Sequence, residues 1–233
     1  ARAGQCANLP LMIKPDQKSE SFWAQAALGA GFKSVLFTDV RTVKDIARCH
    51  QAIRPDNPKN GGHMGVKLRR PALSGYSDQG PGSSPESYVQ DLESIVFLIM
   101  IEKHMTVENI DEILSGAKDY GVDMTQWGPA DYGFSRGKPN LMNTPEIRPV
   151  EELVIRKCLE HGIHPRIEIG DSDKAKRYID RSFDSVKLTS ILFFLKTSLF
   201  FFKVISKIGR LLLSEKDVLK SALLVIFLYI LTP

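Results

Sequence analysis

Residues 95–103 read Ile-Val-Phe-Leu-Ile-Met-Ile-Glu-Lys, and this stretch decides the fold class. Seven consecutive apolar residues, without the alternation of a half-exposed strand, are typical of a β-strand buried on both faces. Strands of this kind occur mainly in parallel sheets whose two faces are both covered. The apolar run stops at Glu102, so the sequence places a carboxylate at the end of a buried strand.

Strand-like and helix-like stretches alternate five times along the chain around this run. The stretches that favour strands are 11–14, 34–40, 95–101, 122–127 and 166–169. The stretches that favour helices are 19–28, 42–52, 106–114, 149–161 and 171–179, with Thr42 and Thr106 as expected N-terminal caps. Between residues 54 and 85 lies a long polar stretch that we expect to be a functional or mobile loop. This alternation predicts an α/β fold with a parallel sheet, either a barrel or a doubly wound sheet.

Polar residues at the strand ends favour the barrel. Lys14, Asp39, Glu102 and Asp131 each stand at or just after the carboxyl end of an expected strand. A (β/α)8 barrel carries its chemistry at that end. In addition, no glycine-rich dinucleotide fingerprint follows any of the strands, which argues against a nucleotide-binding sheet.

Glu102 and Asp131 end consecutive strands and are the candidate metal ligands. In a barrel these positions lie side by side at one mouth, and two carboxylates with water and substrate oxygens suit a hard ion such as Mg²⁺ or Mn²⁺. The alternative interpretation is that each carboxylate caps the following helix or forms an ion pair at the rim.

Three segments resemble the HpcH/HpaI aldolase and citrate lyase family. They are Leu-Ile-Met-Ile-Glu-Lys (98–103), Val-Glu-Asn-Ile-Asp-Glu-Ile-Leu (107–114) and Gly-Val-Asp-Met-Thr-Gln-Trp-Gly-Pro-Ala-Asp-Tyr (121–132). Ala-Leu-Gly-Ala-Gly-Phe (27–32) and Gly-Ile-His-Pro-Arg-Ile-Glu-Ile (162–169) extend the resemblance, which covers residues 9–179. It implies an incomplete (β/α)8 TIM barrel of the phosphoenolpyruvate/pyruvate type.

The resemblance also implies an activity, a cofactor and site residues. Glu102 and Asp131 match the family's metal ligands, and Gly128, Ala130 and Asp131 match the segment that holds the substrate carboxylate. The implied protein is a class II aldolase, a lyase that uses Mg²⁺ or Mn²⁺, with Co²⁺ a further candidate. Its partners would be pyruvate or a related 2-keto acid, an aldehyde, and further copies of the chain in a homo-oligomer. The metal would stabilise the enolate left when the aldol bond breaks.

The sequence departs from the family pattern at three places. Lys14 stands where the family has an arginine beside the keto oxygen, so the charge is kept and the bidentate geometry is lost. Gly29 stands where characterised aldolases have an aspartate contributed by a neighbouring subunit. The family's general-base histidine lies on a strand upstream of Leu9, and the chain has no matching strand. We therefore expect this chain to be a poor catalyst unless His63 or His104 takes that role.

For the other charged residues singled out, a purely structural role and a functional role are both considered. His50 is expected on a helix as a surface or packing residue. Lys67, Arg69 and Arg70 form a basic cluster in the long polar stretch, either solvated or binding the far carboxylate of an acidic substrate.

The composition changes near Arg181, which divides the chain into an expected aldolase domain, 1–181, and a tail, 182–233. The tail holds 7 of the 12 Phe residues and carries 7 Lys and Arg against 3 Asp and Glu, while 16 of the 17 Gly residues precede it. Lysines interrupt its apolar runs, so an interfacial or partner-binding helix is one interpretation. Translation through AT-rich non-coding DNA and an ordinary helix pair are the others. We expect the tail to lie outside the barrel, and contact with a membrane is not favoured.

Charge and cysteine content limit the remaining functions. Residues 1–181 carry equal numbers of basic and acidic side chains, which argues against nucleic acid as a partner, because phosphate binding needs a basic face. The three cysteines have no short spacing and are expected to be reduced thiols of a cytoplasmic protein, rather than disulfides or zinc ligands. Two hypotheses result: a metal-dependent aldolase, or an impaired relative that acts as a membrane-associated or subunit-binding protein.

Overall fold

The computed structural model describes residues 10–16, 20–65, 84–169 and 192–195. Its contacts divide the chain into two compact units, residues 1–163 and 164–233. The first unit holds four parallel strands, β1 (Met12–Ile13), β2 (Ser34–Phe37), β3 (Val96–Ile101) and β4 (Met124–Trp127). They pair in chain order, with Leu36 beside Leu98 and Leu98 beside Met124.

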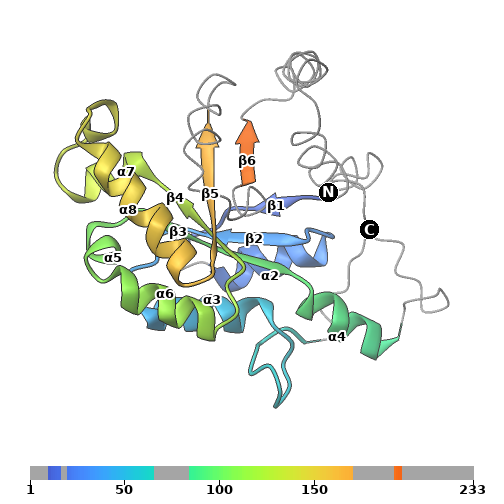
Figure 1. Ribbon diagram of the computed structural model, residues 1–233. Coiled ribbons are helices and arrows are strands. Elements are labelled where there is room, and N and C mark those ends of the chain that lie inside the picture. Colours follow the sequence, from blue (N-terminus) through green and yellow to red (C-terminus); the bar gives the residue numbers. More distant parts are fainter. Residues whose placement is uncertain (1–9, 17–19, 66–83, 170–191, 196–233) are drawn as a thin grey trace, which may run out of the picture. The chain divides into compact units, whose positions relative to one another are not determined.

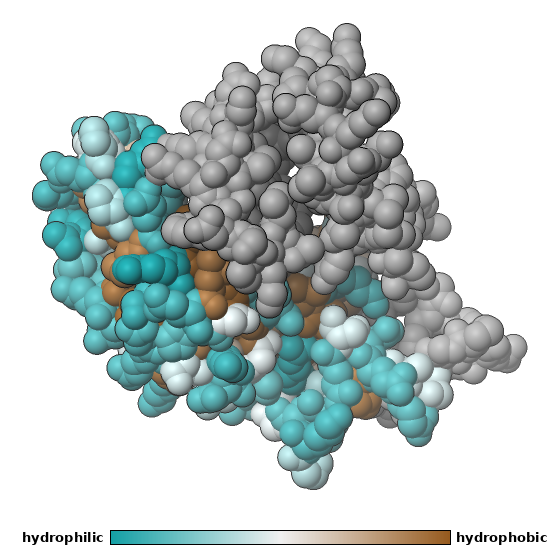
Figure 2. Space-filling model, in the orientation of Figure 1, coloured by the Kyte–Doolittle hydropathy of each residue, from teal (hydrophilic) through white to brown (hydrophobic). Residues whose placement is uncertain are grey.

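Helices alternate with these strands and cover one face of the sheet (Figure 1). They are α2 (Glu20–Gly29), α3 (Val43–Ile53), α4 (Pro85–Glu93), α5 (His104–Glu108), α6 (Ile110–Asp119), α7 (Pro129–Ser135) and α8 (Ile147–Glu160), with a 3-10 turn, η1 (Leu141–Asn143). Helix α2 packs on α3, α3 on α6 and α6 on α8. Apolar side chains of this layer and of the sheet form the main core, and the surface over α5 and α6 is mainly hydrophilic (Figure 2).

Local sequence signals explain how two of these helices begin. The Thr42 hydroxyl accepts a hydrogen bond from the Asp45 amide, and the Asp45 carboxylate accepts one from the Thr42 amide, so α3 begins with a complete capping box. The expectation for Thr106 is wrong, because α5 already begins at His104. The Thr106 hydroxyl donates instead to the Val40 carbonyl, at 2.7 Å, and ties α5 to the end of β2.

Helix α4 was not predicted, because its sequence has few apolar residues. The Ser84 hydroxyl caps it and Pro85 occupies its first turn. The buried Arg54 guanidinium then donates to the carbonyl oxygens of Leu92, Glu93 and Ile95, which joins the end of α4 to the start of β3. The basic cluster of Lys67, Arg69 and Arg70 lies outside the described residues.

The second unit contains β5 (His164–Ile169) and β6 (Leu192–Leu195), which pair in parallel with Arg166 beside Leu192. Strand β6 lies in the predicted tail, residues 182–233, and the expectation that the tail lies outside the barrel stays a prediction. Its sequence, Leu-Phe-Phe-Leu, is itself typical of a buried parallel strand. The expected helix at 171–179 and the predicted boundary at Arg181 lie outside the described residues, and the boundary stays a prediction. Within the described ranges, none of the helices combines the length and apolar character that a bilayer crossing requires.

Candidate active site

The side chains on the two faces of β3 pack in two different clusters, and this difference shows on which face Glu102 lies. Phe97, Ile99 and Ile101 point into the core beneath the helices. Leu98 and Met100 point to the opposite face, where they pack with Leu36 in a separate small cluster. Side chains on a strand alternate between faces, so Glu102 continues the second series, after Leu98 and Met100. We call this second face the inner face of the sheet.

Glu102 is buried and its carboxylate is held in a fixed direction. The residue is 2% exposed, and its Oε1 accepts a hydrogen bond from the backbone amide of Asp39 at 2.7 Å. Gly128 lies on the neighbouring strand end, so close that a Cβ added there would be 2.7 Å from the Glu102 Cβ and 3.0 Å from its Oε2. A side chain at this position would therefore force Glu102 or Met100 to shift.

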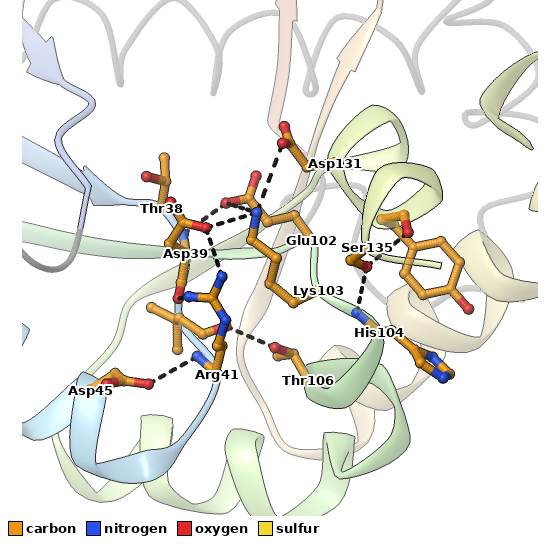
Figure 3. Close-up of polar contacts among 12 residues, drawn as sticks. Thr38, Asp39, Arg41, Asp45, Glu102, Lys103, His104, Thr106, Asp131 and Ser135 are labelled. Carbon is orange, nitrogen blue, oxygen red and sulfur yellow. Dashed lines mark hydrogen bonds and ion pairs between the residues drawn. The ribbon is translucent and has the colours of Figure 1, made fainter. Parts of the chain in front are cut away.

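One amine, Lys103 Nζ, faces three carboxylates at the strand ends (Figure 3). It is 2.7 Å from Asp39 Oδ1, 3.9 Å from Glu102 Oε1 and 3.7 Å from Asp131 Oδ1. The Lys103 side chain is 14% exposed, whereas that of Asp131, on α7, is 58% exposed. The structure thus brings the two predicted metal ligands within 4 Å of a single point.

Asp39 supports this arrangement from an unusual backbone conformation. Its φ of 60° makes it the sole non-glycine residue with a positive φ in the described ranges. Arg41 fixes it there by donating from Nη1 to the Asp39 carbonyl oxygen at 3.0 Å and from Nη2 to Oδ1 at 3.4 Å. Non-glycine residues in this region are strained and cluster at functional sites. Asp39 uses the conformation to present its amide to Glu102 and its carboxylate to Lys103.

Burial raises the pKa of Glu102 above its ordinary value. The hydrogen bond from the Asp39 amide and the charges of Lys103 and Lys14 oppose this rise, and the charge of Asp131 adds to it. A buried carboxylate with a raised pKa at the carboxyl end of a buried strand is a candidate for a functional role.

Lys14, predicted as the cation beside the keto oxygen, is exposed after β1, and its charge reaches Glu102. The cation nearest the carboxylates is instead Lys103, which was not proposed as a site residue from the sequence. The predicted role of Lys14 is untested and stays a prediction, as does that of the segment that includes Ala130, which is exposed in the first turn of α7.

Of the two histidines considered as alternative bases, His63 is exposed, whereas His104 has other partners. The His104 ring points away from the carboxylates (Figure 3), with Nε2 3.1 Å from Glu108 and Nδ1 3.3 Å from Arg136 Nη1. The His50 ring nitrogens contact the carbonyl oxygens of Tyr120 and Asn60, which agrees with a packing role.

Sequence reasoning missed the roles of Lys103 and Asp39. A signal for both was present, since Lys103 follows Glu102 directly and Asp39 ends the neighbouring strand. What sequence cannot supply is the contact between residues 63 positions apart that orients Glu102.

Glu102 and Asp131 are the residues here that could hold a hard divalent ion. Carboxylate oxygens are preferred ligands of Mg²⁺, which usually binds through one or two carboxylates and keeps water or substrate oxygens for its other positions. The buried, oriented Glu102 and the space left at Gly128 fit this pattern. Among the described residues there is no cluster of three or more His, Cys, Asp or Glu side chains arranged to hold a metal by themselves.

The sequence matches the family model "HpcH/HpaI aldolase/citrate lyase" over residues 2–190. It is 28% identical over 153 residues to a 2-keto-3-deoxy-L-rhamnonate aldolase of Shigella boydii, an alignment that covers 65% of this chain and 52% of the relative. A protein of the same name from Escherichia coli O1:K1 is 30% identical over 97 residues, 37% of this chain and 35% of the relative. The chain spans about half the length of the first of these curated relatives.

Two crystal structures have a similar fold. A HpcH/HpaI aldolase/citrate lyase family protein from Burkholderia cenocepacia matches with a TM-score of 0.63 and 20% identity, covering 86% of this chain and 72% of that chain. A HpcH/HpaI aldolase from Desulfitobacterium hafniense matches with a TM-score of 0.61 and 18% identity, covering 93% and 76%. The predicted α/β fold of the barrel type is confirmed.

Proposed function

The chain belongs to the HpcH/HpaI aldolase/citrate lyase family, and from this premise we propose that it is a divalent-metal-dependent carbon–carbon lyase. The reaction is the cleavage or formation of an aldol bond next to pyruvate or a related 2-keto acid. One observation carries the proposal: the carboxylates of Glu102, directly after β3, and Asp131, in the first turn of the helix after β4, both lie within 4 Å of a single cationic group.

Glu102 and Asp131 would hold the ion, for which Mg²⁺ and Mn²⁺ are the first candidates and Co²⁺ a further one. When bound, such an ion supplies a Lewis acid that binds the keto acid oxygens and offsets the negative charge that develops as the aldol bond breaks. The Asp39 amide keeps Glu102 pointed into the site, and Gly128 leaves room beside it.

The remaining residues of the mouth would bind and orient the substrate. The segment of Gly128, Ala130 and Asp131 is proposed to receive the substrate carboxylate, on the strength of the family match. Lys14 is proposed to assist at the keto oxygen, and its exposed position after β1 leaves it free to approach a ligand. Of the two histidines considered for the general base, His104 is engaged by Glu108 and Arg136. We therefore propose the exposed His63 as the candidate within the described residues.

The substrate class follows from the relatives' names. A 2-keto-3-deoxy sugar acid is a 4-hydroxy-2-keto acid, and its cleavage gives pyruvate and an aldehyde. We propose this class as the first to test, and we propose that the active form is a homo-oligomer. The predicted cytoplasmic location stays a prediction.

Pyruvate release from 2-keto-3-deoxy-L-rhamnonate tests the proposal. With Mg²⁺ or Mn²⁺ present, we expect turnover that EDTA abolishes. Glu102→Gln should lower this turnover about 100-fold or more, because it removes a carboxylate that holds the Lewis-acidic ion. Glu108→Gln is the matched control, since its exposed carboxylate pairs only with His104 among the described ion pairs, and it should leave turnover unchanged. Turnover that survives both EDTA and Glu102→Gln would contradict the proposal.

The second hypothesis, an impaired relative that binds a membrane or a subunit, gives a different result. It predicts metal binding without turnover in every preparation, including one in which the chain has assembled into oligomers.

A further inference from the structure

The Lys103 amine lies beside the two carboxylates that are proposed to hold the metal ion. This amine is 3.9 Å from one Glu102 oxygen and 3.7 Å from one Asp131 oxygen, so it faces the same two carboxylates that would hold the ion. An ion held by Glu102 and Asp131 would be held by the carboxylates that the Lys103 amine faces. The ammonium and the ion would then be close neighbours of like charge in a site where the lysine side chain is mostly shielded from water.

We propose that Lys103 is a built-in competitor of the divalent ion at the Glu102 and Asp131 pair, and that Asp39 is the residue that holds its amine aside. This inference rests on the proposed function, because it concerns the same metal site. In the metal-free protein the ammonium offsets the charge of the two carboxylates. When a divalent ion enters, the ammonium has to remain on Asp39 or move outward.

The distances from the Lys103 amine support competition with an ion, rather than permanent pairing of Lys103 with Glu102 and Asp131. The contact between Lys103 and Asp39, at 2.7 Å, is a short charge-assisted hydrogen bond, whereas those to Glu102 and Asp131 are longer than a hydrogen bond. The amine is therefore attached to Asp39 and attracted by the other two groups only through space. Two cations about 4 Å apart repel strongly where solvent screening is weak, so Lys103 should weaken metal binding.

Asp39 is built for this holding role. Its own position is fixed by Arg41 and by a backbone conformation that other non-glycine residues of the described ranges do not adopt. The same residue orients Glu102 through its amide. Because the amide and the carboxylate of Asp39 act separately, Asp39→Asn removes the charge that holds Lys103 and keeps the hydrogen bond to Glu102.

The test is the affinity for Mn²⁺, measured in the 233-residue chain by electron paramagnetic resonance of the free ion. Lys103→Met keeps most of the length of the side chain and removes its charge, and we expect it to tighten Mn²⁺ binding about tenfold or more. Lys103→Arg keeps the charge and should bind Mn²⁺ within about threefold of the unchanged protein. Lys138→Met removes a surface lysine that pairs with Glu146, and is the control for a general charge effect.

Asp39→Asn provides an independent second arm. Freed from Asp39, the Lys103 amine should move toward Glu102 and Asp131, so Mn²⁺ binding should weaken, about threefold to tenfold. In the Lys103→Met background the same change should have a clearly smaller effect, because no amine is left to release. Thermal unfolding followed by circular dichroism establishes that each variant is folded.

The possible results separate this inference from the proposed function. Mn²⁺ binding that Glu102→Gln abolishes but that Lys103→Met leaves equal or weaker would overturn the role of Lys103 and leave the metal site standing. Binding that appears only in Lys103→Met would support the competition strongly. If neither the unchanged protein nor Lys103→Met binds Mn²⁺, both the inference and the metal-dependent function are wrong.

Discussion

The two faces of β3 are built from equally apolar residues and yet do different things. On the helix side, Phe97, Ile99 and Ile101 join a core that extends through α3, α6 and α8. On the inner face, Leu98 and Met100 belong to a cluster of three buried residues, and the next position in the series is the charged Glu102. The helix side therefore supplies most of the stability of this unit, whereas the inner face leads to the chemistry.

This comparison explains why the inner face can carry residues that lower the stability of the fold. It carries a buried carboxylate, a glycine whose replacement would collide with that carboxylate, and a strained aspartate beside them. Each of these lowers stability when taken alone. A large apolar core on the opposite face allows the fold to keep them.

The largest effect should come from a matched pair of truncations on the two faces. Ile99 and Leu98 are neighbours of equal size and are both buried, on the helix side and on the inner face respectively. We expect Ile99→Ala to lower the free energy of unfolding by about 4 kcal/mol and Leu98→Ala by about 2 kcal/mol, because cavity cost depends on how closely the surroundings are packed.

Urea unfolding followed by circular dichroism measures both values. Equal costs would mean that the inner face is packed as tightly as the helix side, and the comparison would fail.

A change at Gly128 should separate crowding from backbone conformation. Its φ of −119° suits any residue, so Gly128→Ala acts only through the added methyl, which would meet Glu102 and Met100 at 2.7 Å. We expect a loss of about 1–3 kcal/mol in stability, together with at least tenfold weaker Mn²⁺ binding as Glu102 is pushed aside.

The control for this change is Gly65→Ala, where an added Cβ would meet nothing within 4 Å. Calorimetric titration with Mn²⁺ and thermal unfolding should show no change in this variant. Unchanged Mn²⁺ affinity in Gly128→Ala would show that the close approach of Gly128 to Glu102 has no importance for the site.

Much of the fold and part of the site could be predicted from sequence, for identifiable reasons. The strand that ends at Glu102 was predicted because an unbroken apolar run is a local signal, and the capping box at Thr42 is another. Helix α4 was missed because its start depends on Ser84 and Pro85 and its end on a buried arginine 38 to 41 positions earlier in the chain.

In the site, too, the contacts between residues far apart in the chain could not be predicted from the sequence. Glu102 and Asp131 could be proposed from their places at strand ends, which the parallel sheet brings together. The holding of Lys103 by Asp39 could not, because it depends on a positive φ and on a contact across neighbouring strands. Neither leaves a periodic pattern in the sequence.

The smallest effect should be a gain in stability when the Glu102 carboxylate on the inner face is replaced by a neutral amide. Glu102 is buried and its pKa is raised, so the folded protein binds a proton there more readily than the unfolded chain does. The stability that this group contributes is fully present below the ordinary pKa of glutamate and is lost as the pH rises through the folded pKa. Glu102→Gln has no proton to lose and keeps an oxygen for the Asp39 amide. In EDTA it should therefore match the unchanged protein under acidic conditions and exceed it near neutral pH by on the order of 1 kcal/mol. Urea unfolding at a series of pH values measures this difference, with Glu108→Gln as the exposed control. A lower stability for Glu102→Gln near neutral pH would mean that the attraction of Lys103 outweighs the cost of burying the carboxylate, and that the inner face is stabilised by its charges rather than weakened by them.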